Sequence, residues 1–449
     1  MNCSTTFRIR KAAVLAALFL AATMALHGQT YQEKLRENRE RASAEYHYYE
    51  AVAEPISPAP KGYKPFYISH YGRHGSRYLT SGSYFAKARA GLDAAAGKGL
   101  LTEEGKLVLR QLDTLMEEHE GMYGMLTRRG AEEHRGIARR MEARFPRVFS
   151  GKGGRNQVEC VASYWPRCLV SMANCTEGLQ EKTEGLAFTF ITGPKYLDYI
   201  SMDLDTKELS KRSKAFERRI AHFLPSPDRL YAALFTDPEA ARTLIGDTDA
   251  FVKSLFDAAT ISPNTEAHPD LFAHFTDDEL AGLWIRKNNR MYYRYGISAE
   301  EGDFVRAIAK PLIHDIIEKA DAALQDGSER AADLRFGHDV GLLPLVGTIG
   351  IEGMQEHFPS ENVHTHWFAF DMVPMASNLQ MVFFRNKRGH VLVQLLYNER
   401  ETSIPALPAA TGKFYDWNVL RAYLKALETA IPDDNIVRDT EKKQRSGVA

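Results

Sequence analysis

Residues 66–77 read FYISHYGRHGSR, so a strand-like segment leads directly into a short loop of glycine and basic residues. Phe66–His70 has the composition of a β-strand. Gly72 and Gly75 allow the backbone to turn sharply and to approach a ligand closely. In open α/β sheets, ligands bind beyond the carboxyl ends of the strands. We therefore expect this loop to border a binding site.

The side chains of this loop predict an anion pocket. Arg73 and Arg77 flank His74, and the planar fork of a guanidinium matches the oxygens of a phosphate group. An imidazole among cations has its protonated form disfavoured, so a ring nitrogen of His74 stays free to act as a nucleophile. The alternative is a surface loop in which the arginines pair with carboxylates and His74 fills space.

A second segment adds another arginine. Arg167 follows Ser163 and Pro166 in the expected first turn of a helix, directly after a short strand over residues 158–162. Helix N-termini bind anions through unpaired N–H groups, so Arg167 would complete a phosphate clamp. The alternative is a solvated surface arginine.

A third segment, Gly337-His338-Asp339, ends the expected strand Leu334–Phe336. Here His338 would bind a phosphoryl oxygen and Asp339 would move a proton. The alternative is that Asp339 caps a helix beginning near Val340, with His338 as a buried hydrogen-bonding residue.

The order of elements predicts the fold class. Strand followed by helix, repeated, indicates an α/β core. Between residues 194 and 327 the pattern changes to successive helices, expected at 208–224, 238–244, 277–295 and 299–324. A hairpin over 379–384 and 391–396 and a final helix with Val419, Tyr423, Leu424 and Leu427 on one face follow. The expected domains are a signal peptide (1–28), an α/β core (29–193 with 328–430), a helical cap (194–327) and a disordered tail (431–449).

Composition excludes several classes of protein. The 449 residues carry 57 Lys and Arg against 58 Asp and Glu, and 44% are hydrophobic. With a mean hydropathy of -0.35, the chain is neither a multi-span membrane protein nor collagen-like nor wholly disordered. The balanced charge also argues against a nucleic-acid partner.

The first 28 residues resemble a secretory signal. Arg8, Arg10 and Lys11 precede the uncharged run Ala12–Leu26, which is shorter than the roughly 20 residues of a membrane span. Cleavage after Gly28 would change the formal net charge from −1 to −4. The expectation is an exported protein, periplasmic or secreted, without a membrane association after cleavage; an uncleaved anchor is the alternative.

Cysteine and histidine placement leaves two further questions. Cys168 and Cys175 lie roughly 10 Å apart along a helix, too far to bridge each other. A single bridge from one of them to Cys160 and three buried free thiols both stay open. His364 and His366 flank Thr365 and on a strand would point the same way, as in some metal sites, but no diagnostic ligand set accompanies them.

Together, Arg73-His74-Gly75-Ser76-Arg77 and the distant His338-Asp339 resemble the histidine acid phosphatase branch of the histidine phosphatase superfamily. The resemblance extends over roughly His70–Glu399. It includes Leu126-Thr127 with Gly130, then Ser163, Arg167, Ser171 and Gly178-Leu179, and Pro374–Asn378. Leu334–His338 and Gly341–Leu345 look most like the multiple inositol polyphosphate phosphatases.

The resemblance implies a phosphoglycerate-mutase-like α/β/α sandwich with an inserted, mostly helical subdomain. It also implies that His74 becomes a phosphohistidine and that Asp339 donates a proton to the leaving group. Phosphate would be bound by Arg73, Arg77, Arg167 and His338. No metal and no cofactor are expected, and an acidic pH optimum follows from the need for a protonated Asp339.

Two departures from the family pattern bear on the substrate. Leu79 stands where the family usually has proline, and Asp339 directly follows His338 where inositol polyphosphate phosphatases have His-Ala-Glu. Inositol polyphosphates such as phytate are the leading substrate class, with Arg128-Arg129, and less so Arg286, Lys287 and Arg290, as candidates for extra phosphates. The alternatives are a broad-specificity acid or sugar phosphatase, a non-catalytic phosphate-binding protein, and a metal-dependent hydrolase centred on His364 and His366. The oligomeric state stays open.

Overall fold

The computed structural model of the chain describes residues 29–51, 54–151, 154–196, 200 and 206–432. The expected signal peptide and nearly all of the expected tail lie outside these residues. Within the described part, no helix is both long and apolar enough to cross a membrane. The three cysteines found there, Cys160, Cys168 and Cys175, are buried and free.

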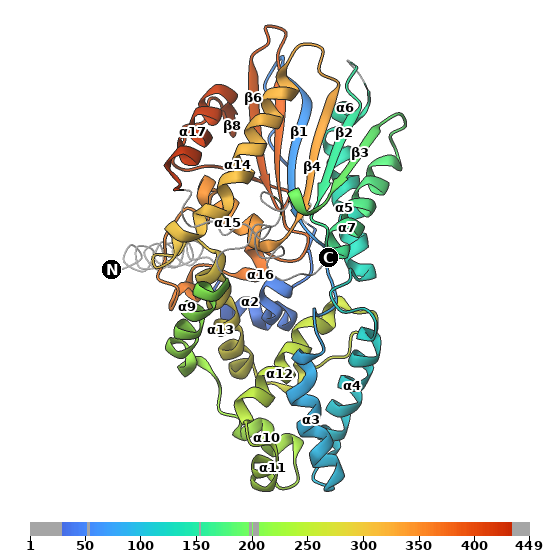
Figure 1. Cartoon of the computed structure of the whole chain (residues 1–449), viewed down its shortest axis with the longest axis vertical. Helices are drawn as coiled ribbons and strands as arrows, with labels where there is room; N and C mark the ends of the chain where they lie inside the picture. Colours follow the sequence, from blue (N-terminus) through green and yellow to red (C-terminus); the bar gives the residue numbers. More distant parts are fainter. Residues whose placement is uncertain (1–28, 52–53, 152–153, 197–199, 201–205, 433–449) are drawn as a thin grey trace, which may run out of the picture.

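An eight-stranded mixed sheet forms one end of the molecule (Figure 1). Its order is β3-β2-β4-β1-β5-β6-β7, with β8 paired to β6. The strands are β1 (Lys64–Arg73), β2 (Gln157–Ala162), β3 (Ala187–Thr192), β4 (Arg330–Gly337), β5 (Asn378–Arg385), β6 (Val391–Tyr397), β7 (Arg400–Thr402) and β8 (Phe414–Asp416).

The central strand β1 sets the direction of its neighbours. It pairs in parallel with β4 and antiparallel with β5, while β2 runs parallel to both β4 and β3. As a result β1, β2 and β4 end at the same edge of the sheet. This mixed α/β architecture confirms the expected fold class.

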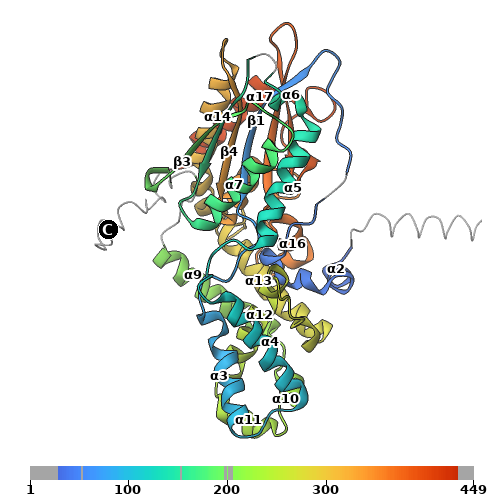
Figure 2. The same cartoon turned by 90° about the vertical axis from the view of Figure 1, so that its right-hand side faces the viewer.

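Helices cover both faces of the sheet (Figures 1 and 2). Consecutive residues of β1 point to opposite faces, so Tyr67 joins one hydrophobic cluster and Ile68 the other. The Ile68 side is covered by α5 (Arg128–Arg144), α6 (Pro146–Phe149) and α7 (Pro166–Gln180). The Tyr67 side is covered by α14 (Gly302–Leu324), α15 (Asp339–Ile349) and α17 (Trp417–Ala430).

A largely helical part extends from the carboxyl edge of the sheet (Figure 2). It contains α9 (Thr206–Arg219), α10 (Asp228–Leu234), α11 (Pro238–Ile245), α12 (Thr248–Ile261) and α13 (Asp277–Tyr295). Helices α3 (Ser83–Gly97) and α4 (Glu103–His119) pack with it, mainly against α12 and α10. They come from the segment assigned to the core by sequence, so the domain boundaries stay a prediction.

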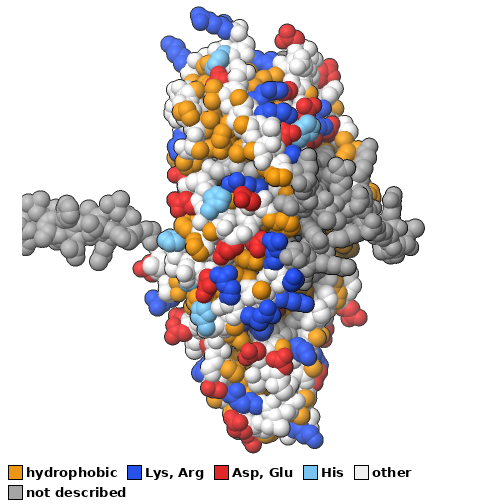
Figure 3. Space-filling model, turned by 60° about the vertical axis from the view of Figure 1, so that its left-hand side comes forward, with side chains coloured by type: hydrophobic (Ala, Val, Ile, Leu, Met, Phe, Trp, Pro, Cys, Tyr) orange, Lys and Arg blue, Asp and Glu red, His pale blue; other side chains and the backbone are white. Residues whose placement is uncertain are grey.

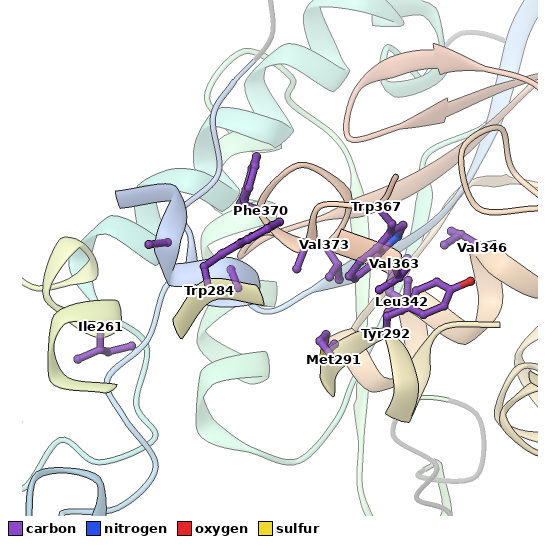
Figure 4. Packing of buried hydrophobic residues seen from close by; sticks show 14 of the residues in the cluster. Ile261, Trp284, Met291, Tyr292, Leu342, Val346, Val363, Trp367, Phe370 and Val373 are labelled. Atoms are coloured by element: carbon purple, nitrogen blue, oxygen red, sulfur yellow. The ribbon is translucent and has the colours of Figure 1, made fainter. Parts of the chain in front are cut away.

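The N-terminal arm joins the two parts. It forms α2 (Tyr31–Glu37) and a 3-10 helix η1 (Arg39–Tyr46), which contacts α12, α13 and α16 (Ala369–Met372). On α13, Trp284 is fully buried and stacks on Tyr31 with ring centroids 5.1 Å apart. Figure 4 shows Trp284, Met291 and Tyr292 of α13 packed among residues of α15 and of the 363–373 segment. This shared core fixes α13 against the sheet.

Some expected elements differ from the structure. The strand β3 and the helices α3, α10 and α12 were not expected. The final helix is present, but Val419 is exposed, and Trp417, Leu420 and Leu424 form its buried face. His364 lies in a 3-10 turn, η6 (Val363–Thr365), instead of on a strand, and His366 follows it.

The shared core around Trp284 gives a stability prediction. Removing a fully buried indole leaves a cavity, so Trp284→Ala should lower the free energy of unfolding by about 3–5 kcal/mol. Urea unfolding followed by circular dichroism measures this loss. Val419→Ala, on an exposed helix position, is the matched control and should change the value by less than about 0.5 kcal/mol. Equal, small effects of the two variants would mean that Trp284 does not anchor α13.

Candidate active site

Three strand ends bring the expected site residues together. Arg73 of β1 pairs with Gly337 of β4, and Ala162 of β2 pairs with Phe336. The residues that come directly after these strands are His74, Ser163 and His338. They therefore meet at one edge of the sheet, as the rule for α/β ligand sites anticipates.

The loop after β1 is held tightly by backbone contacts. His74 donates its backbone N–H to the carbonyl of Gly337 at 2.9 Å and accepts one from Ala376 at 3.0 Å. A Cβ on Gly75 would lie 2.4 Å from the carbonyl oxygen of Gly130. Only glycine fits this close approach, which brings the loop against the start of α5. Ser76 is fixed by Glu133, which accepts its backbone N–H and its hydroxyl, each at 2.7 Å.

The imidazole of His74 is oriented by its own loop. Its Nδ1 lies 2.8 Å from the carbonyl oxygen of Gly75. A carbonyl oxygen only accepts hydrogen bonds, so Nδ1 carries the proton and Nε2 keeps its lone pair. Burial lowers the pKa of His74 well below its ordinary 6.5, and the nearby charges of Arg167 and Arg73 lower it further. The ring is therefore neutral and nucleophilic at Nε2.

Arg73 is buried and anchored on both sides of its guanidinium. Its Nη1 donates to the carbonyl oxygens of Glu45 and Val373. Its Nη2 lies 2.8 Å from Oδ2 of Asp339. The side chain is thus fixed at the end of β1, and the carboxyl group of Asp339 lies beside it.

Arg77 and Arg167 approach from two other elements. Arg77 donates from Nη1 to the carbonyl of Tyr78, and its guanidinium lies 4.8 Å from the ring centroid of Tyr46. Arg167 sits at the start of α7, stacked over Trp165 at 5.3 Å. Within the described part of the chain, the Nε groups of both arginines and of Arg73 are buried without a hydrogen-bond partner. Three guanidiniums with spare donors are what an oxyanion site needs.

His338 completes this side of the pocket. Its Nε2 lies 3.0 Å from the hydroxyl of Ser163, and its Nδ1 lies 3.5 Å from Nη2 of Arg167. The rings of His338 and His74 meet edge to face at 5.5 Å. Burial, with the charge of Arg167, lowers the pKa of His338 to about 3.

Asp339 is the first residue of helix α15 and also faces the pocket; the N-cap position is His338, so the alternative that Asp339 caps this helix is wrong. Its Oδ1 accepts the backbone N–H of Val340 at 2.9 Å, while Oδ2 pairs with Arg73. Burial alone would raise the pKa of this carboxyl, but the charges of Arg73 and Arg77, with the hydrogen bond from the Val340 N–H, outweigh it and hold the pKa below its ordinary value. All six expected site residues therefore lie together.

A cavity of about 220 Å³ adjoins these residues on the side of the helical part. Arg77 and Asp339 line it together with Glu45 and Tyr46 of the N-terminal arm. Its remaining cations, Lys287, Arg290 and Arg294, come from α13. These three residues are three and four positions apart, so they lie on one face of α13, which differs from the face that carries Trp284 and Tyr292 into the shared core.

Two basic groups were considered from the sequence for binding extra phosphates, with Arg128-Arg129 preferred over Arg286, Lys287 and Arg290; the lining of the cavity reverses this preference. Lys287 pairs with Glu45 at 3.0 Å and Arg290 with Glu217 at 3.2 Å, and both line the cavity. Arg128 is largely exposed and lies 3.5 Å from Glu266. The weaker sequence candidate is thus the better placed one. Tyr46 and Glu45 were missed because nothing in a polar N-terminal arm signals that it folds onto a strand end.

The pair His364 and His366 has other partners. Nδ1 of His364 lies 3.1 Å from the side-chain amide of Asn289, and the ring of His366 stacks on Phe358 at 4.8 Å. Within the described ranges, no group of three or more His, Cys, Asp or Glu side chains has the arrangement of a metal site.

Solved structures with this fold include several enzymes of known type. Multiple inositol polyphosphate phosphatase from Bifidobacterium longum, in complex with inositol hexasulfate, has a TM-score of 0.71 at 20% identity, covering 88% of this chain and all of that one. The phytase from D. castellii has a TM-score of 0.63 at 14% identity, covering 90% of each chain. The Hafnia alvei phytase, in its apo form, has a TM-score of 0.53 at 10% identity, covering 85% of this chain and all of that one. At these identities the likeness demonstrates a shared fold.

The match of the sequence to a family model identifies the family, which the shared fold alone does not. The family model for the histidine phosphatase superfamily (branch 2) matches residues 72–398. This range includes both the loop around His74 and the His338-Asp339 pair at the second strand end. It spans well over half of the chain, which therefore belongs to branch 2 of the histidine phosphatase superfamily.

Proposed function

We propose that the protein hydrolyses phosphomonoesters through a phosphohistidine on His74, with inositol polyphosphates as the substrate class. The observation that carries this proposal is the state of the His74 ring. Its Nδ1 is committed to the Gly75 carbonyl, while Nε2 is unprotonated in a pocket that contains Arg73, Arg77 and Arg167. A neutral nucleophile among fixed cations suits attack on a phosphate group.

In the first step, Nε2 of His74 attacks phosphorus and the ester P–O bond breaks. The leaving alkoxide takes a proton from Asp339. In the second step, water attacks the phosphohistidine, gives a proton to Asp339, and the P–N bond breaks to release inorganic phosphate. Splitting the hydrolysis into two displacements avoids one difficult step.

The arginines stabilise the phosphoryl oxygens in both steps. Charge on these oxygens is met by donors that are already in place, which is the main source of catalysis in phosphoryl transfer.

We infer that phosphate draws Arg167 away from Nδ1 of His338. The added negative charge then favours protonation of His338, whose Nδ1–H would donate to a phosphoryl oxygen.

Asp339 needs a proton although its pKa is lowered in the empty pocket. A bound phosphate places negative charge beside the carboxyl and competes for Arg73, so both effects raise its pKa toward the acidic working range. A substrate that arrives as the monoanion can also supply the proton. Either route favours acidic pH.

The cavity beside the site supports a substrate with several phosphates. Lys287, Arg290 and Arg294 lie beyond the reacting phosphate, where a simple sugar phosphate would place no charge. The Bifidobacterium longum enzyme of the same fold was solved with inositol hexasulfate, a ligand that carries several sulfate groups. A broad-specificity acid or sugar phosphatase is the second candidate, because the three pocket arginines suffice for a single phosphate.

We also propose that the protein is exported. The basic residues Arg8, Arg10 and Lys11, followed by the apolar run Ala12–Leu26, support this proposal.

The nucleophile gives the first test of this function. His74→Ala should abolish release of phosphate from phytate, since no other group replaces Nε2. Treating the unmodified protein with a chelator should leave the rate unchanged, because no step uses a metal. His314→Ala, an exposed histidine paired with Glu428, is the matched control and should keep full activity. If the unmodified protein binds phosphate but releases none from phytate, it is a non-catalytic phosphate-binding protein.

The proton donor gives a test based on the leaving group and on pH. Asp339→Asn should slow hydrolysis of phytate by about 10²–10⁴-fold, the range of general acid catalysis. p-Nitrophenyl phosphate needs no protonated leaving group, so its first step should be nearly unchanged and a phosphohistidine should accumulate. Rapid-quench measurement of acid-labile enzyme-bound phosphate detects it. In the unmodified protein, kcat for phytate should fall as pH rises and Asp339 loses its proton. An alkaline optimum, or equal slowing of the first, phosphorylation step for both substrates in the variant, would contradict this role.

The substrate class gives a third test. Arg294→Gln should raise KM for phytate about tenfold, because it removes one charge that faces the distal phosphates, and should leave kcat/KM for p-nitrophenyl phosphate unchanged. Arg128→Gln is the matched control. Equal kcat/KM values of the unmodified protein for phytate and for a simple sugar phosphate would favour the second candidate.

A further inference from the structure

A second basic cavity, of about 640 Å³, lies at the other end of the central strand. The cations that line it are Lys61, Lys64, Arg147, Arg155, Arg385, Lys387 and Arg388. They come from the start of β1 with the residues just before it, from helix α6, from the residues just before β2, and from the end of β5 with its turn into β6. Four separate parts of the chain therefore converge on one concave surface.

This basic cavity is far from the candidate active site. Lys64 begins β1 and Arg73 ends it. A strand rises about 3.3 Å per residue, so the two sites are about 30 Å apart. Its lining residues lie at the start of β1 and at the turn from β5 into β6. In Figure 1 this end of the sheet is opposite the helical part. The basic cavity cannot hold the distal phosphates of a substrate bound at His74.

The charges of the basic cavity are not neutralised. No Asp or Glu lines it, and none of the seven cations forms an ion pair with a carboxylate in the described residues. On the face shown in Figure 3, by contrast, acidic and basic side chains are interspersed. Like charges gathered in this way repel one another, and a bound anion would relieve this repulsion.

Two of the arginines are held in fixed positions. The guanidiniums of Arg155 and Arg385 lie 5.0 Å and 4.4 Å from the ring centroid of Phe66. Each also donates to one backbone carbonyl at 2.8 Å, Arg155 to Arg330 and Arg385 to Leu324. Nε of Arg385 is buried with no partner in the described residues. Partial burial and the neighbouring Arg385 lower the pKa of Arg155. These guanidiniums are positioned in advance with donors to spare.

The chemistry and the size of the basic cavity define its ligand. Guanidinium forks match phosphate and sulfate oxygens. The volume lies in the usual range of small-molecule pockets, about 300–1,000 Å³. Its lining has no histidine, cysteine or carboxylate that could act as nucleophile or proton donor. We propose that this cavity is a second site, which binds a small anion carrying several phosphate or sulfate groups and does not hydrolyse it.

The first experiment measures binding of inositol hexasulfate, a probe that the protein does not consume, by isothermal titration calorimetry. Lys387→Gln/Arg388→Gln removes two exposed charges in the β5–β6 turn, where neither side chain packs into the core. We expect the unmodified protein to have a site that this variant weakens by about tenfold or more. The variant should keep kcat/KM for p-nitrophenyl phosphate. Lys98→Gln/Arg128→Gln, which also removes two exposed cations, is the matched control and should bind the probe normally.

The result does not depend on the proposed function. If His74 is inactive, the site that is sensitive to Lys387 and Arg388 still binds the probe. If instead the unmodified protein, the variant and the control bind inositol hexasulfate identically, the second site is excluded while the phosphatase proposal stands.

A second experiment locates the ligand. Trypsin cleaves after lysine and arginine, and Lys387, Arg388 and Lys98 are all exposed. Inositol hexasulfate should slow cleavage in the 385–390 turn and leave cleavage after Lys98, in the turn between α3 and α4, unchanged. Sodium sulfate at the same ionic strength is the control for screening. Equal rates with and without the probe at both positions would overturn the proposal.

A third experiment distinguishes two sources of the same chemistry. Vesicles of neutral lipid with phosphatidylinositol bisphosphate present the anion as a headgroup. Co-sedimentation that is lost in the Lys387→Gln/Arg388→Gln variant would assign the site to a headgroup, and binding of the soluble probe alone would assign it to a free anion. Failure to bind either one would contradict the proposal.

Discussion

The buried contact between Arg73 and Asp339 connects the fold to the chemistry of the site. Arg73 ends β1 and Asp339 begins α15, just after β4, so this ion pair joins the two parallel strands at their shared edge. Burying a guanidinium is costly unless its donors are met. Two backbone carbonyls and one carboxylate meet part of that need here. The remaining donors, with those of Arg77 and Arg167, leave an excess of positive charge that only an anion can satisfy. Burial, together with this positive charge, lowers the pKa of His74 and keeps its ring neutral.

The helical part supplies cations to the cavity and also fixes their position relative to the sheet. Helix α13 has two working faces: one carries Trp284 and Tyr292 into a core shared with α15, and the other carries Lys287, Arg290 and Arg294 toward the cavity. Because α15 also carries Asp339, the proposed proton donor and the cations of the cavity are attached to the same packed unit. Their separation is thus set by core packing and not by a loop.

The sequence predicted the elements whose signals are local. The strand β1, the hairpin β5–β6 and helix α13 were expected within a few residues. In the structure Thr276 and Glu279 form a capping box at the start of α13. The site residues His74, Arg167 and His338 were found because each comes directly after a strand or opens a helix, and such positions meet at one edge. The strand β3 was missed although its sequence, AFTFIT, is rich in aromatic and β-branched residues; it is a largely exposed strand at the edge of the sheet. Tyr46 and Arg294 were missed because their place beside the site depends on long-range packing of η1 and α13.

The two ends of β1 illustrate what positive charge alone can and cannot do. Both ends gather arginines against aromatic rings, Arg77 against Tyr46 at one and Arg385 against Phe66 at the other. At the first end, an oriented imidazole and a carboxyl group lie among the guanidiniums, and we propose that they act there as nucleophile and proton donor. At the second end neither group is present in the lining. Under these two proposals the same attraction for phosphate leads to bond cleavage in one place and to binding in the other, and the difference depends on His74 and Asp339.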